Sequence, residues 1–72
     1  MKGTKKFYNK MVESIREDER RIANLNETKK GAVYTKMYDE QIMFLQGRIN
    51  AMKEVVYTIY PDCELDNDLK QG

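Results

Sequence analysis

The chain has 72 residues, and its 13 basic side chains nearly balance its 12 acidic ones, for a net charge of +1. This balance argues against a dedicated DNA-binding protein, which carries a basic stripe, and equally against an acidic DNA mimic. One cysteine and no histidine leave no internal disulfide and no zinc site of the Cys/His type. So short a chain has a marginal core and usually needs a disulfide, a metal or partner subunits, so oligomerisation is the support that remains.

The location of the protein is predicted from two further features. No apolar run approaches the ~20 residues of a membrane span. The start of the chain, MKGTKKFYNK, is charged and lacks the apolar segment of a secretory signal. We therefore expect a cytoplasmic protein without a membrane partner, and the composition suggests no cofactor and no metal.

A first helix is predicted over residues 5–29. Thr4 is a suitable N-cap, and Lys29 and Lys30 are cations in the last turn, before Gly31. One face carries a heptad-like seam in steps of three and four residues, which consists of Tyr8, Met11, Ile15, Asp18, Ile22 and Leu25.

A second helix is predicted over residues 33–60. Its seam is out of phase with the first one, so the chain must break between them, and Gly31 lies at the break. Pro61 ends the helix, because the residue before a proline is pushed out of the helical region. The seam has the same heptad-like spacing and consists of Tyr38, Ile42, Leu45, Ile49, Met52, Val56 and Ile59.

The two seams match each other in one antiparallel register. Facing residues in such a hairpin have a constant sum of residue numbers, and these pairs sum to 63 or 64 throughout. The sequence therefore predicts an all-α fold, with residues 1–60 forming an antiparallel helical hairpin. The matched pairs are Tyr8–Val56, Met11–Met52, Ile15–Ile49, Asp18–Leu45, Ile22–Ile42 and Leu25–Tyr38.

Residues 61–72 form an acidic tail. The segment PDCELDNDLKQG has four acidic residues, one lysine and few apolar side chains. Such a segment has little apolar surface to bury, so we expect it to be mobile. We also expect that the chain can be truncated at residue 61 without loss of helicity.

The second helix carries more apolar surface than the first can cover. Met37, Phe44 and Ala51 form a second row at a spacing of seven, with Val55 near its end. Gly47 and Ala51 make a small-xxx-small step that lets another backbone approach; alternatively, Gly47 is a tolerated surface glycine. Exposed contiguous apolar surface usually marks a contact. These five residues predict a homo-oligomer interface, most simply in a dimeric four-helix bundle.

Asp18 is the polar member of the first seam. It either leans towards solvent or acts as a register device that pairs with Arg21 or Arg48. Neither role is catalytic. The run ESIREDERR is typical of a solvated face with i,i+4 ion pairs, and no set of residues resembles an active site. We therefore expect no enzyme activity and assign no catalytic residues.

The stretch between the helices has two interpretations. Lysines before a glycine are typical of a helix C-terminus and turn, which requires no ligand. Lysines and tyrosines around the start of the second helix would also suit a phosphate-bearing or nucleotide ligand. The candidate site consists of Lys29, Lys30, Tyr34, Thr35, Lys36 and Tyr38.

In general style the chain resembles the short helical hairpins, rich in Lys, Glu, Tyr and Met, that are encoded by small reading frames of bacteriophages. The resemblance implies a host-interaction or anti-defence factor, and it carries over no residue. We therefore expect a non-enzymatic, self-associating protein that binds and inhibits a partner protein. The alternatives are a sponge that holds a cyclic nucleotide or similar molecule between subunits, and a purely structural assembly protein. Binding to nucleic acid is not expected.

Overall fold

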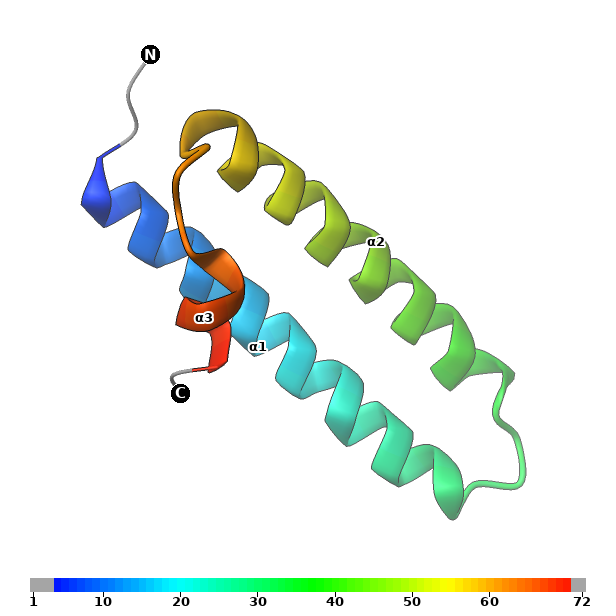
Figure 1. Cartoon of the computed structure of the whole chain (residues 1–72). Coiled ribbons are helices and arrows are strands. Elements are labelled where there is room, and N and C mark those ends of the chain that lie inside the picture. Colours follow the sequence, from blue (N-terminus) through cyan, green and yellow to red (C-terminus); the bar gives the residue numbers. More distant parts are fainter. Residues whose placement is uncertain (1–3, 71–72) are drawn as a thin grey trace.

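The computed structural model describes residues 4–70 and consists of three helices. They are α1 (Lys5–Lys30), α2 (Lys36–Ile59) and α3 (Leu65–Lys70). Helices α1 and α2 run antiparallel along a molecule of 47 × 21 × 15 Å, and α3 packs against α1 near the open end of the hairpin (Figure 1). The predicted all-α hairpin is confirmed, and the part of the chain from 4 to 70 has no helix long and apolar enough to cross a membrane.

Helix α1 begins and ends close to the predicted residues. The Thr4 hydroxyl accepts a 3.1 Å hydrogen bond from the Phe7 amide, which is the predicted N-cap. At the other end, the Gly31 amide donates to the Thr28 carbonyl at 3.2 Å. Gly31 has φ −98°, a value open to any residue. The helix therefore ends without a left-handed glycine.

Helix α2 begins three residues later than predicted, at Lys36 instead of residue 33. Val33 and Tyr34 lie in the connection and are 103% and 80% exposed. β-branched and aromatic residues have lower helix propensity, and these two bury almost nothing that would offset it. The end of α2 at Ile59, with Tyr60 as C-cap before Pro61, agrees with the prediction.

The core follows the two predicted seams and has two additional members, Val12 and Leu65. Ile15, Ile42, Leu45, Ile49 and Val56 are all buried, with at most 9% of the residue exposed. Val12 is also buried, although it is not a seam position, whereas its neighbour Met11 is only half-buried. Val12 belongs to the same cluster as Leu65, so the third helix explains its burial.

The tail, predicted as a mobile acidic segment, contains a short helix. Residues 65–70 form α3, and Leu65 is only 1% exposed. Leu65 packs in the core cluster, with the partly buried Cys63 and Leu69 against it. The segment has few apolar residues, but these three fall on the side that contacts the hairpin. The acidic composition therefore gave no indication of a helix that packs against the hairpin.

Candidate functional site

The clearest candidate for a binding surface is the second apolar row of α2. Met37, Phe44 and Val55 are 61%, 65% and 43% exposed. Gly47 and Ala51 are exposed as well. The structure therefore places all five predicted interface residues outside the core of the single chain, on a helix whose opposite seam is buried against α1.

A shallow groove continues this row towards α1. It has a volume of about 340 Å³ and lies between the two helices beside Phe44. Its lining combines apolar and uncharged polar side chains with one arginine. The lining residues are Arg21, Asn24, Leu25, Gln41, Phe44 and Leu45.

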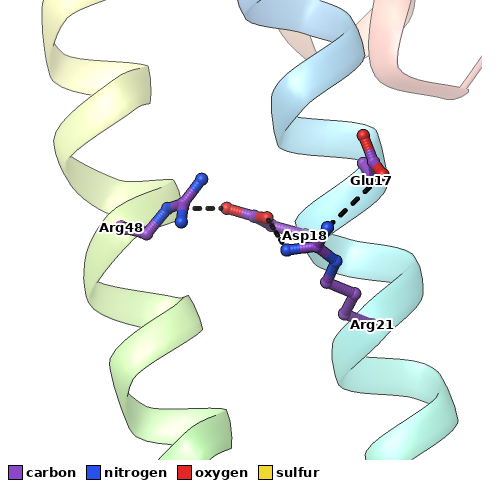
Figure 2. Close-up of polar contacts among 4 residues, drawn as sticks. All are labelled: Glu17, Asp18, Arg21 and Arg48. Carbon is purple, nitrogen blue, oxygen red and sulfur yellow. Dashed lines mark hydrogen bonds and ion pairs between the residues drawn. The ribbon is translucent and has the colours of Figure 1, made fainter.

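Asp18 lies beside this face and is almost completely buried, with 2% of the residue exposed. Its Oδ2 is 3.2 Å from Arg48 Nε across the hairpin, and its Oδ1 is 3.8 Å from Arg21 Nη1 one turn along α1 (Figure 2). Arg21 also reaches Glu17 at 3.5 Å. The contact of Oδ2 with Arg48 lacks hydrogen-bond geometry and is an ion pair only. Of the two interpretations of Asp18, the structure agrees with the buried, paired one, in which Asp18 faces both Arg21 and Arg48.

This ion-pair cluster is compatible with the register device that was one of the two interpretations of Asp18. A buried carboxylate without a cation costs several kcal/mol in general, and of the two cations near Asp18 only Arg48 comes from the other helix. The Arg48 and Arg21 side chains are themselves 49% and 55% exposed. With Glu17 included, the cluster has two cations and two carboxylates, so its charges balance.

The predicted turn site is brought together only in part. Lys29 Nζ is 2.5 Å from Asp39 Oδ1, and Lys30 Nζ is 3.1 Å from Glu27 Oε1. Two of its lysines therefore face carboxylates of the chain itself. The Thr35 side chain makes no capping hydrogen bond at the start of α2, and the strongly exposed Tyr34 lies outside the helix.

Tyr38 and Lys36 complete the description of this predicted site. Tyr38 is half-buried, as its seam position requires, whereas Lys36 is exposed as the first residue of α2. The six residues lie at one end of the molecule, with two of the lysines in ion pairs, one tyrosine in the seam and the other in the connection. They line none of the grooves described here.

The open end of the hairpin has a polar arrangement that the sequence did not predict. The Tyr8 hydroxyl donates to Asp68 Oδ2, and Arg16 Nη2 donates to the Asp68 carbonyl at 2.5 Å. The rings of Tyr8 and Tyr60 pack edge to face, with centroids 5.1 Å apart, and the Tyr60 hydroxyl donates to the Thr4 carbonyl at 2.5 Å. Tyr8, Tyr60 and α3 together thus close this end of the hairpin.

The pKa of the Tyr8 phenol is raised above the usual value of about 10. The larger cause is desolvation by burial, and the smaller one is the hydrogen bond to Asp68. A cleft of about 710 Å³ lies next to this contact, between α1 and Asp68. Cationic and anionic side chains alternate along it, which does not select for one class of ligand. The charged lining residues are Lys5, Glu13, Arg16, Glu17, Arg20 and Asp68.

Residues 4–70 contain no group of three or more Cys, Asp and Glu residues placed to hold a metal ion. In comparisons with known proteins, no family model, no curated protein and no solved structure matches the chain.

Proposed function

We propose that the protein is a small non-enzymatic binding protein that self-associates through α2. The observation that carries this proposal is the apolar row formed by Met37, Phe44, Ala51 and Val55, which lies outside the core of the single chain. Single exposed apolar residues are ordinary, but several of them on one face of a helix are typical of a contact.

The size of the hairpin strengthens this argument. One buried seam between two helices, extended by one short helix, gives a small core, and chains of this length are often stabilised by association. A second copy supplies apolar surface to α2 without any new sequence element. The resulting bundle would then bind a partner protein through its outer surface, as an inhibitor or adaptor of the host-interaction type.

The test is the oligomeric state of Phe44→Glu compared with Met43→Glu. Both residues are strongly exposed, at 65% and 70%, so neither substitution should unfold the single chain. They are neighbours in sequence, and their side chains therefore point about 100° apart around the helix. Sedimentation velocity should show an oligomer for the wild type and Met43→Glu, and a monomer for Phe44→Glu with unchanged helical circular dichroism. A wild type that is monomeric at 100 μM would contradict the proposal.

A further inference from the structure

We propose that α2 packs antiparallel against α2 of a second copy, about a two-fold axis that passes beside Phe44. This inference rests on the proposed self-association and specifies its symmetry and register. A two-fold interface is self-complementary, so each residue before the axis meets the residue equally far behind it. The α2 sequence can therefore be examined for pairs that are equidistant from one residue.

The apolar row of α2 is symmetric about Phe44. Met37 and Ala51 lie seven residues to either side of it and are both exposed. An antiparallel pair of helices centred on Phe44 therefore places each Met37 on the other copy's Ala51 and the two Phe44 rings on each other.

The charges that flank the row have the same symmetry with opposite sign. Glu40 and Arg48 lie four residues to either side of Phe44, and both are exposed. The antiparallel arrangement forms two equivalent Glu40–Arg48 pairs between the copies. A parallel arrangement in register places Glu40 on Glu40 and Arg48 on Arg48, and like charges across an interface are unfavourable. The charge pattern therefore selects the antiparallel form.

Arg48 connects this interface to the interior of each hairpin. It approaches Asp18 through Nε, at 3.2 Å (Figure 2). A guanidinium has five N–H donors in a planar fork and can contact two carboxylates at once. In the dimer, one Arg48 thus lies between the buried Asp18 of its own chain and Glu40 of the other. The residue that pairs with Asp18 across the hairpin also specifies the register between the copies.

Gly47 fits the same arrangement. Gln41 and Gly47 lie three residues to either side of Phe44, so the longer side chain of one copy faces the glycine of the other. A Cβ atom added at Gly47 meets nothing within 4 Å in the single chain. The single chain therefore gives no steric reason for a glycine inside α2, where it is less favourable than alanine, whereas the close approach of a second helix gives one.

Disulfide cross-linking tests the register. In a Cys63→Ser background, the double variant Met37→Cys/Ala51→Cys should form covalent dimers efficiently upon mild oxidation. The two positions are ~21 Å apart along one helix, so they cannot be linked within a chain. Each single variant should stay largely unlinked. In the antiparallel register, residue 37 of one copy lies ~21 Å from residue 37 of the other along the helices, and the same holds for residue 51. Non-reducing gel electrophoresis gives the result.

The possible outcomes separate this inference from the self-association on which it rests. A wild-type dimer whose single variants cross-link at 37 or at 51 shows a parallel interface and overturns the inference alone. Absence of cross-links from all three variants, with a dimeric wild type, shows that another face is used. A monomeric wild type overturns the self-association itself.

A charge substitution gives a second, independent measurement. Glu40→Lys should weaken the dimer about tenfold or more, because two symmetric pairs become repulsive contacts. Glu19→Lys is the matched control, since it makes the same charge change at an exposed position of α1. Equal dissociation constants for these two variants in sedimentation equilibrium would overturn the proposed pairing.

Discussion

The two ends of the hairpin are held in different ways. At the open end, α3 covers the core with Leu65, and Asp68 accepts hydrogen bonds from Tyr8 and Arg16. At the turn end, the contact between the helices includes the ion pair of Lys29 with Asp39, whose side chains are 37% and 48% exposed. Exposed ion pairs contribute little, whereas a buried leucine contributes several kcal/mol.

The third helix therefore stabilises its end of the hairpin more than the turn stabilises the other end. Local opening is easiest where few apolar side chains are buried, which describes the connection with its exposed Val33 and Tyr34. We therefore expect the turn end to fray first.

The largest effect is expected from Leu65→Ala. Removal of this 1%-exposed side chain should lower the free energy of unfolding by about 2–5 kcal/mol, and Leu25→Ala near the turn should cost less because Leu25 is only half-buried. Urea unfolding followed by circular dichroism measures both. The two variants should be made in the Phe44→Glu background, so that self-association affects neither. An equal or larger loss for Leu25→Ala would contradict the comparison.

The next effect is expected from Tyr8→Phe, which removes the hydrogen bond to Asp68. The free energy of unfolding should fall by about 1 kcal/mol at neutral pH. The raised pKa of Tyr8 also determines in which direction its contribution to the free energy of unfolding changes with pH. The neutral phenol is favoured in the folded state, so its contribution is complete below pH ~10 and is lost as the pH rises towards the folded-state pKa.

Tyr8→Phe should therefore lose less stability than the wild type between neutral pH and pH values above ~10. Tyr34→Phe is the control, because that side chain is 80% exposed at the other end, and it should follow the wild type. Chemical unfolding over this pH range gives the measurement. Parallel curves for the wild type and Tyr8→Phe would mean that the Asp68 contact is not formed in solution.

A smaller effect is expected at the turn. Lys29→Ala should cost no more than about 1 kcal/mol, and the loss should shrink as salt is raised, because exposed charges are screened. Lys36→Ala, at the exposed first residue of α2, is the control. A loss for Lys29→Ala that exceeds that of Leu65→Ala would reverse the order of the two ends.

The smallest effect concerns ligand binding at the turn. The contacts of Lys29 and Lys30 with carboxylates favour the interpretation as a simple turn. Calorimetric titration with mono-, di- and cyclic dinucleotides should therefore give no binding heat. Heat that falls with rising salt and disappears in Tyr34→Ala would instead establish the alternative, a site for a phosphate-bearing molecule.

The hairpin could be predicted from the sequence because its apolar residues recur at a regular helical spacing. Ile15, Ile22, Ile42 and Ile49 repeat at helical spacing, and the buried seams follow from that spacing without knowledge of any other contact. The pairing of Asp18 was one of two interpretations, because the sequence shows the candidate arginines but not the burial that makes the pairing necessary.

The third helix could not be predicted in the same way. Its six residues span fewer than two helical turns, which is too short for a periodic signal. Its stability comes from contacts of Leu65 and Asp68 with α1. Those contacts join residues 52 and 60 positions apart, and only the folded hairpin brings them together. The burial of Val12 was missed for the same reason.

The contact between Tyr8 and Asp68 also has a consequence for the order of folding. These residues are 60 positions apart, so their contact closes a loop of nearly the whole chain, which is entropically the most costly kind. The helices of the hairpin can instead associate progressively from the turn, through short loops, and local contacts form fastest. We therefore expect α3 to dock last, on a hairpin that is already assembled. Until then we expect the cluster of Val12, Ile15, Ile49 and Val56 to lack Leu65, the member that α3 contributes in the native chain.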